Sequence, residues 1–231
     1  MYILWGSYNK DAKYNKMIDD HYDKYFDKNI LSRGLCRIYN GIVQDMRELH
    51  YCNNKDNKPK VNNIGLKYLM NHVRIPFDKK SESIIKKNIH PFIYKNRYLC
   101  MHNGKIEFKK ILSINEKKKI KGTTDSERFF NLLLKIKEEN NLENIYEGIK
   151  EIYKYIKKES LLNIVILDNV ENVIIAYRGI MKHTELPPLY IYKYGITNIR
   201  SDDNYIILQH NALFIRQNAE NIIYKNFIKN L

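Results

Sequence analysis

The sequence predicts an α+β fold in which helices pack on antiparallel sheets, and three observations lead to this prediction. Asn40-Gly41 and Lys95-Asn96 each separate two apolar or alternating stretches, which is typical of β-hairpins. Two helical patterns follow one another between residues 124 and 158. The last third of the chain returns to short strand-like runs. Strands, two consecutive helices and strands again indicate helices that cover antiparallel sheets.

The first half of the chain is expected to be mainly β-structure with exposed loops. Met1-Tyr-Ile-Leu-Trp-Gly6 is typical of a buried first strand, and residues 14–30 carry charged and aromatic side chains at helical spacing. The polar stretch 53–63 is expected to be an exposed loop. Residues 66–73 form a short apolar run that predicts another strand.

The second half contains the clearest helix start. Thr124-Asp-Ser-Glu127 has the spacing of a capping box and stands directly before the apolar run 129–134. A second, amphipathic helix is predicted over residues 142–158. Its apolar stripe consists of Ile145, Ile149, Ile152 and Ile156. The later strands are predicted at 162–167, 173–177, 189–192, 205–208 and 212–215. With no internal repeat and no linker, residues 1–231 are expected to form a single domain.

Composition and charge restrict the class of protein. The chain has 231 residues, of which 44% are hydrophobic, so it can form a substantial core. Its formal net charge is +14. This charge suits an acidic partner or nucleic acid, but it also follows from the lysine-rich codon usage of an AT-rich genome, such as that of a large DNA virus or a parasite. The lysines are widely spread, and their densest cluster, Lys109–Lys121, is short.

The cysteines and the hydropathy pattern bear on cofactors and location. Cys36, Cys52 and Cys100 show no C-x-x-C spacing, which predicts neither a disulfide framework nor a metal site. We expect a reducing, intracellular and cytoplasmic location. No apolar run approaches the roughly 18 residues that a membrane helix needs, so no membrane association is expected. No cofactor is expected either.

Four short segments carry the main functional signal. They are His72-Val-Arg74, Asn88-Ile-His90-Pro, His102-Asn-Gly104 and Thr124-Asp-Ser-Glu127. In order and spacing they resemble the H-x-R, N-x-H-P, H-N-G and T-D-S-E segments of class II glutamine amidotransferases of the stand-alone type. Leu31-Ser-Arg33-Gly34 is similar to the R-G segment of that family. The resemblance implies the N-terminal nucleophile hydrolase fold, a four-layer αββα sandwich of two antiparallel sheets flanked by helices.

The motif resemblance extends over about residues 1–135. Beyond it, the later strands resemble those of the stand-alone members, in which a D-G hairpin precedes a S-E segment. Asp168-Asn169 and Ser201-Asp202 stand at those two places in this sequence.

The resemblance also implies roles for individual residues. In the family, glutamine hydrolysis passes through an oxyanion that is held by an asparagine amide and a glycine N–H. Those donors would be Asn103 and Gly104. Arg74 would bind the α-carboxylate of glutamine, and Asp125 at the helix start would bind its α-ammonium group. Each position also has a structural explanation: a tight turn at residues 102–104, a helix cap at Asp125 and a surface arginine at Arg74.

The pattern departs from the family at the nucleophile. Position 2, where the family has its catalytic cysteine, holds Tyr2, and a phenol with a pKa near 10 is a poor nucleophile. The small polar run that follows the family's arginine is replaced by Ile75-Pro-Phe-Asp78. The acid that usually follows the R-G pair is also absent from Arg33-Gly-Leu-Cys-Arg37.

The sequence therefore predicts a type 2 glutamine amidotransferase-like protein whose ancestral reaction is glutamine to glutamate and ammonia, with that activity impaired. The expected partners are glutamine or a related amino acid, and a protein partner or a second copy of the chain. One alternative is a binding or structural protein that uses the same fold, for an acidic partner or nucleic acid. A weaker alternative is a different hydrolase that uses Cys36 or Tyr2.

Overall fold

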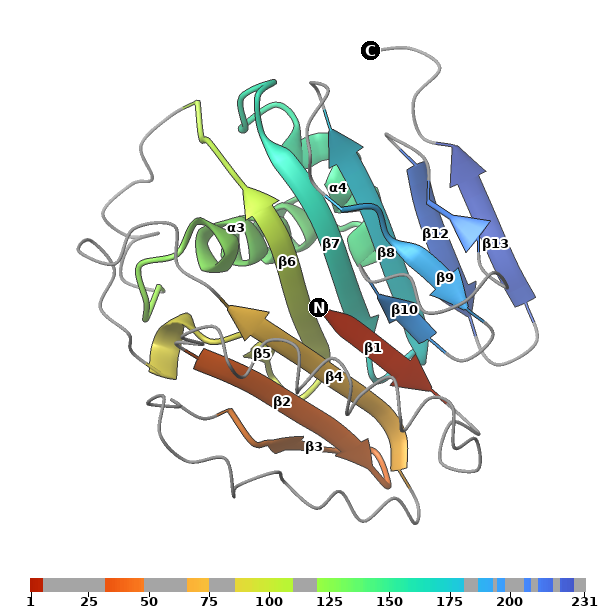
Figure 1. Ribbon diagram of the computed structural model, residues 1–231. Helices are drawn as coiled ribbons and strands as arrows, with labels where there is room; N and C mark the ends of the chain where they lie inside the picture. The colour runs from red at the N-terminus through yellow and green to blue at the C-terminus, as the bar shows by residue number, and fades with distance from the viewer. Residues whose placement is uncertain are drawn as a thin grey trace.

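The computed structural model describes residues 1–5, 32–47, 66–74, 86–109, 120–180, 187–192, 195–197, 206–208, 212–217 and 221–226. Within these ranges two antiparallel sheets face each other, and helices cover the outer face of the second sheet (Figure 1). This arrangement confirms the predicted α+β sandwich. The helical pattern at 14–30 and the polar stretch 53–63 lie outside the described residues.

Among the described residues, the first sheet has seven strands in the order β11-β9-β10-β1-β4-β2-β3. The buried Ile3 of its central strand β1 pairs with Ile196 on one side and with Met70 on the other. The predicted strands at the chain start and at 66–73 are therefore confirmed. The strand bounds are β1 (Tyr2–Trp5), β2 (Ser32–Tyr39), β3 (Ile42–Asp45), β4 (Leu66–Arg74), β9 (Tyr190–Tyr192), β10 (Gly195–Thr197) and β11 (Ile206–Ile207).

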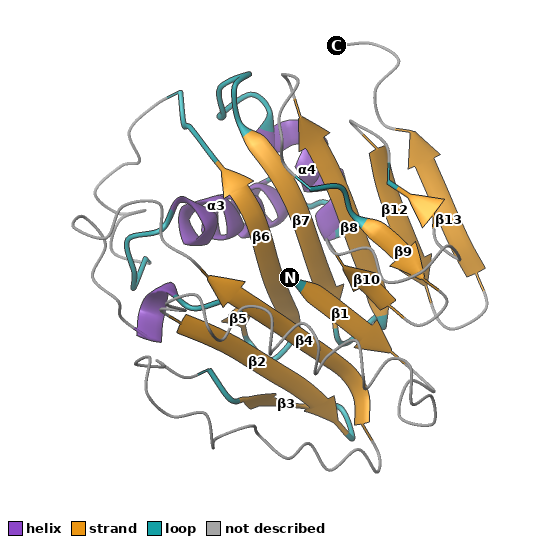
Figure 2. Cartoon of the chain, in the orientation of Figure 1, coloured by secondary structure: helices purple, strands orange, loops and turns teal. Residues whose placement is uncertain are grey.

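In the part of the chain that the structure describes, the second sheet has six strands in the order β13-β12-β8-β7-β6-β5. Its neighbouring strands are all antiparallel (Figure 2). The helices separate β6 from β7 in sequence, and three strands of the first sheet separate β8 from β12. The bounds are β5 (Phe92–Tyr94), β6 (Tyr98–Lys105), β7 (Leu161–Asp168), β8 (Val173–Ile180), β12 (Ala212–Gln217) and β13 (Asn221–Asn226). The sequence did not predict β10 and β13, whereas the other strands of the last third lie where it placed them.

Both predicted hairpins are present. Asn40 and Gly41 join β2 to β3 with φ angles of 48° and 76°. Lys95 and Asn96 join β5 to β6 with φ angles of 48° and 54°. Two consecutive positive φ angles are the signature of the type I′ turn, whose twist matches that of paired strands.

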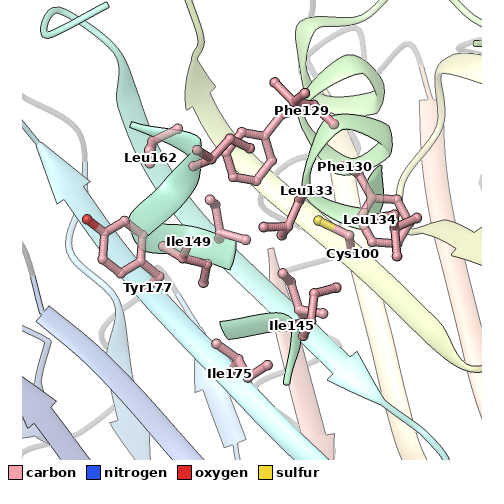
Figure 3. Close-up of a cluster of buried hydrophobic side chains, with 14 of the residues drawn as sticks. Cys100, Phe129, Phe130, Leu133, Leu134, Ile145, Ile149, Leu162, Ile175 and Tyr177 are labelled. Carbon is pink, nitrogen blue, oxygen red and sulfur yellow. The ribbon is translucent and has the colours of Figure 1, made fainter. Parts of the chain in front are cut away.

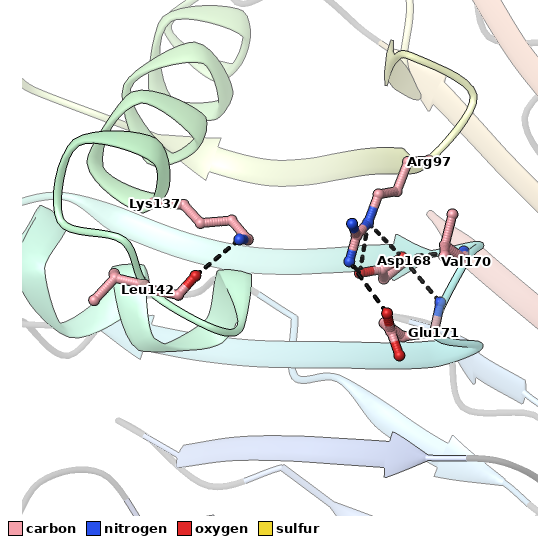
Figure 4. Close-up of polar contacts among 6 residues, drawn as sticks. All are labelled: Arg97, Lys137, Leu142, Asp168, Val170 and Glu171. Carbon is pink, nitrogen blue, oxygen red and sulfur yellow. Dashed lines mark hydrogen bonds and ion pairs between the residues drawn. The ribbon is translucent and has the colours of Figure 1, made fainter.

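The β7–β8 turn confirms the expected hairpin at Asp168-Asn169. The Asp168 carboxylate accepts hydrogen bonds from the backbone N–H groups of Val170 and Glu171 at 3.1 and 3.2 Å. It also pairs with the Arg97 guanidinium at 2.9 Å (Figure 4). The Asn169 side chain donates to the carbonyl of Gly41 at 2.9 Å, which links this turn of the second sheet to the β2–β3 turn of the first.

The described helical elements are η2 (Lys86–Asn88), α3 (Asp125–Glu139) and α4 (Ile145–Ile152). The Thr124 hydroxyl caps α3 by accepting from the Glu127 N–H at 3.2 Å, as the capping-box spacing predicts. The reciprocal half of the box is replaced by another contact. The Glu127 carboxylate accepts from the N–H groups of Lys121 and Gly122 at 2.8 and 2.7 Å, so it fixes the loop before the helix.

The prediction of one helix over residues 142–158 was wrong in its extent, because α4 ends at Ile152. Beyond it, the backbone pairs with the segment after β6. Lys109 donates to the Tyr155 carbonyl at 2.8 Å, and Lys157 donates to the Glu107 carbonyl at 2.7 Å. These long-range hydrogen bonds replace the helical ones. Ile156 is still 1% exposed, so the apolar stripe is buried although its last member is not helical.

Two cores lie on the two faces of the second sheet. The inter-sheet core contains Leu99 and Met101 of β6. The core beneath α3 and α4 contains Tyr98 and Cys100, and Figure 3 shows Cys100 among the side chains of this core. Successive residues of a strand point to opposite faces. Asn103 therefore continues the inter-sheet side of β6, whereas His102 continues the side that faces the helices.

Among the described helices, none has the length and apolarity to cross a membrane.

Candidate functional site

The motif segments of the sequence meet at one end of the sandwich. The imidazole of His72 on β4 stacks on that of His90, with ring centroids 4.2 Å apart. The Nε2 atom of His72 also lies 3.0 Å from the carbonyl oxygen of His102, to which it donates. The H-x-R, N-x-H-P and H-N-G segments are thus in direct contact, and this contact joins the first sheet to the second.

The R-G segment joins the same cluster through Gly34. Gly34 pairs with His72 in the β2–β4 ladder. A Cβ atom at position 34 would lie 1.3 Å from the carbonyl oxygen of His90. No side chain fits in that space, so glycine is required for the approach of the His90 segment to β2.

The Asn88 side chain fixes the loop that leads into α3. Its Nδ2 donates to the Thr123 hydroxyl at 3.0 Å, and its Oδ1 accepts from the Thr123 N–H at 2.8 Å. Asn88 is 1% exposed, so both ends of a buried amide are satisfied by one residue. The N-x-H-P segment therefore also holds the T-D-S-E segment in place.

Asn103 and Gly104 lie at the end of β6. Gly104 has a φ angle of 147°, and a Cβ at this position would lie 2.1 Å from the carbonyl oxygen of Leu161. The H-N-G segment thus needs glycine for two independent reasons. Asn103 is half-buried on the inter-sheet face. Its amide makes no hydrogen bond to the part of the chain that the structure describes.

Asp125 stands at the first residue of α3. Its Oδ2 accepts from the backbone N–H of Ile106 at 2.6 Å, and its Oδ1 accepts from the N–H of Ser126 at 2.8 Å. It therefore ties the segment that follows β6 to the start of the helix, whereas the cap of the helix is Thr124. A carboxylate has about four lone-pair sites, so these bonds leave capacity for a further donor.

His102 connects the two parts of this site. Its Nδ1 lies 2.8 Å from the Ser126 hydroxyl, and its Nε2 lies 2.9 Å from the Leu161 carbonyl. The Ser126 hydroxyl lies 3.3 Å from Asp125 Oδ1. Burial lowers the pKa of His102, and the nearby Asp125 charge opposes that shift.

The structure places the backbone of Arg74 at the last residue of β4, in register with Ser32. Its side chain lies outside the described part of the structure, so its proximity to Asp125 stays a prediction. Residues 75–78 and 201–202 also lie outside the described ranges. Of the lysine cluster, Lys109 and Lys121 are exposed, and residues 110–119 are not described.

Neither described cysteine has the properties of a nucleophile. Burial and the Asp45 carboxylate raise the pKa of Cys36 to about 12. Burial also raises the pKa of Cys100, which lies in the core beneath the helices. Both thiols are therefore protonated at neutral pH, which argues against a hydrolase that uses Cys36. Tyr2 of β1 pairs with Asn71 of β4 and with Thr197 of β10, and its side chain is not described.

Sequence reasoning missed a buried polar row beside Asn103. Asn163 on β7 faces Asn103, and Arg178 on β8 faces Asn163. Arg178 Nη1 donates to Asn163 Oδ1 at 3.2 Å and to the Pro187 carbonyl at 2.8 Å. Burial lowers the pKa of the Arg178 guanidinium. The sequence contained one sign of this row. The two apolar strands Leu161–Asp168 and Val173–Ile180 each carry one of these polar residues, Asn163 and Arg178.

The described residues include no group of three or more His, Cys, Asp or Glu side chains that could hold a metal ion.

Comparison with known proteins gives matches in structure. No protein-family model and no curated protein sequence matches the chain. Glutamine phosphoribosylpyrophosphate amidotransferase from B. subtilis superposes with a TM-score of 0.66 at 12% identity, over 100% of this chain and 49% of that one. The chain thus spans about half the length of that enzyme.

Two shorter proteins are matched over most of their length. A glutamine aminotransferase class-II domain protein from Silicibacter pomeroyi has a TM-score of 0.57 at 17% identity, with 87% of this chain and 94% of that one covered. A predicted glutamine amidotransferase from Pseudomonas aeruginosa has a TM-score of 0.51 at 16% identity, with 84% and 87% covered. At these identities the likeness shows the fold alone, which is a sandwich of antiparallel sheets with helices.

Proposed function

We propose that this protein is a glutamine amidotransferase-like pseudoenzyme, which binds glutamine or a related amino acid but hydrolyses it slowly or not at all. The observation that carries the proposal is the meeting of five separate sequence segments at the end of β6. Each of these segments resembles a segment of class II glutamine amidotransferases. Such a concentration of matching residues at one place supports a common site.

In this proposal, the ligand's side-chain amide lies against Asn103 and Gly104. The amide of Asn103 and the backbone N–H of Gly104 donate to the ligand's carbonyl oxygen, which is the arrangement that would stabilise an oxyanion during hydrolysis. The absence of a hydrogen bond from Asn103 to the described residues supports this role, because the donor is not already used.

The α-amino and α-carboxylate groups of the ligand are assigned to Asp125 and Arg74. Asp125 is held by two backbone N–H groups, so its orientation is fixed before a ligand arrives. Its remaining lone pairs suit an ammonium group. Arg74 would pair with the carboxylate through its planar guanidinium, which matches that geometry with two parallel hydrogen bonds.

The proposed loss of hydrolysis rests on the nucleophile. Position 2 holds Tyr2, whose phenol is mostly protonated at neutral pH. The raised pKa values of Cys36 and Cys100 argue against a replacement by either thiol. An active ancestor would have released glutamate and ammonia, and the ammonia would have passed to an acceptor enzyme.

Two measurements on the purified protein test this proposal. Isothermal titration calorimetry with L-glutamine is expected to show binding, and D-glutamine serves as a control of the same composition. A coupled glutamate assay is expected to show no turnover above that of buffer. Binding of neither amino acid would refute the ligand assignment. Glutamate release by the unmodified protein would refute the loss of activity, and a Tyr2→Cys variant provides the matched comparison.

A further inference from the structure

Three side chains connect the proposed oxyanion donors to the proposed ammonium site. His102 directly precedes Asn103, and its Nδ1 lies 2.8 Å from the Ser126 hydroxyl. That hydroxyl lies 3.3 Å from Asp125 Oδ1. Since His102 and Ser126 are 2% and 5% exposed, water has little access to this chain of groups.

The direction of these hydrogen bonds depends on one proton. The Leu161 carbonyl can only accept, so His102 Nε2 carries a hydrogen in every state. When His102 is neutral, its Nδ1 accepts, and the single proton of the Ser126 hydroxyl points to it. When His102 is protonated, Nδ1 becomes a donor, and the Ser126 proton is released to turn toward Asp125.

We propose that His102 and Ser126 are positioning residues that couple the charge at Asp125 to the geometry of Asn103 and Gly104. This inference rests on the proposed function, because the ligand's ammonium group supplies the positive charge at Asp125. A bound ammonium group and a protonated His102 then compete for the same carboxylate. Ligand binding therefore favours the neutral imidazole, to which the Ser126 hydroxyl donates. The bond from Nε2 to the Leu161 carbonyl is present in both states and holds the strand beside Asn103.

The surroundings of His102 support this coupling. On α3 the titratable neighbour is Asp125, and on β7 the contact is the Leu161 carbonyl. On the side of the first sheet, His72 donates to the His102 carbonyl and stacks on His90. Burial opposes a charge on His102, while Asp125 favours one, so the charge state is sensitive to what Asp125 binds.

The first test measures L-glutamine affinity by calorimetry at about pH 7.5 and about pH 5, the lower pH being chosen because burial lowers the pKa of His102 below the usual histidine range. The wild type is expected to bind roughly fivefold or more weakly at the lower pH, a typical size for coupling between two sites. Ser126→Thr keeps the hydroxyl and is expected to keep this pH dependence. Ser126→Ala and His102→Gln are expected to lose it. Equal pH dependence in all four proteins would overturn the proposal, as would its absence in the wild type.

The second test does not require glutamine binding. The ring nitrogen shifts of His102 in the ligand-free protein, measured by NMR, report which nitrogen carries the hydrogen and whether the other accepts a bond. We expect an Nε2–H imidazole whose Nδ1 shift moves in Ser126→Ala and stays in Ser126→Thr. An unchanged Nδ1 shift in Ser126→Ala would overturn the proposed coupling through His102 and Ser126. If no variant binds glutamine, the proposed function is refuted. The NMR measurement alone then decides whether the His102–Ser126 hydrogen bond exists.

Discussion

The imidazole of His102 donates to the carbonyl oxygen of Leu161 at 2.9 Å, and the same oxygen would lie 2.1 Å from a Cβ at position 104. One backbone carbonyl of β7 thus holds the residue before Asn103 and restricts the residue after it. The H-N-G segment is fixed on both sides of its asparagine by a single atom. This geometry leads to the first two predictions.

Gly104→Ala is expected to destabilise the protein by about 3 kcal/mol, because the new Cβ would meet the Leu161 carbonyl and the φ angle of 147° is unfavourable for alanine. Gly41→Ala is the matched control. Its φ angle is 76°, but a Cβ there meets nothing within 4 Å, so the cost should be roughly 1 kcal/mol. Urea unfolding of both variants measures the difference. Equal losses would contradict the contact with Leu161.

Asn103→Ala is expected to abolish glutamine binding while it changes the free energy of unfolding by no more than about 0.5 kcal/mol. The reason is that its amide makes no hydrogen bond to the described residues. Asn163→Ala, directly across the ladder, should instead cost about 1–3 kcal/mol, because it removes partners of the Arg178 guanidinium and the Pro187 carbonyl. Calorimetry and urea unfolding distinguish the two. A large loss of stability in Asn103→Ala would indicate a structural role for that amide.

Stability is expected to fall as the pH drops below about 6.5, partly because of His102. Burial lowers the pKa of His102 in the folded protein, so the unfolded chain binds more protons between the lowered value and the ordinary one. The stabilisation is therefore complete above the ordinary pKa and is lost with decreasing pH. Urea unfolding at several pH values should give a smaller slope for His102→Gln than for the wild type, by at most about 1.4 kcal/mol per pH unit. The same slope in both proteins would show that His102 does not contribute.

Cys36 and Cys100 are expected to resist thiol reagents until the protein unfolds. At about pH 8, a thiol with a pKa of about 12 is ionised in roughly one molecule in ten thousand, and both side chains are buried. A Cys52→Ser variant removes the remaining cysteine, so any labelling by a disulfide reagent then comes from these two. Rapid labelling of one thiol in the folded variant would reopen the case for a cysteine nucleophile.

The sequence predicted the features that depend on neighbouring residues. Asn40-Gly41 and Lys95-Asn96 determine their turns locally, and Thr124 caps α3 within the same segment. The end of α4 could not be predicted in this way, because Lys157 pairs with the distant Glu107. β10 is only three residues long, and its partner β1 lies nearly the whole chain away.

The same distinction between local and long-range features applies to the site. The motif resemblance singled out Asn103, Gly104 and Asp125, and the structure places the first two near the end of β6 and the third at the start of α3. The contacts of His102 with Ser126 and Leu161 were not predicted, since they depend on which strand lies beside β6. For Glu127 the motif predicted the helix start correctly but not the hydrogen-bond partner of the side chain. Its carboxylate accepts from the loop before the helix instead of closing the capping box.

The position of β1 has a consequence for how the chain is made. During synthesis, β5 to β8, α3 and α4 all come from the stretch 92–180, and each strand after β5 can pair with a neighbour that is already present. β1 precedes this stretch in the sequence, yet one of its two neighbours, β10, follows it. One edge of β1 therefore stays unpaired until residues 195–197 have been made, and its backbone N–H and C=O groups are open to pairing with other chains until then.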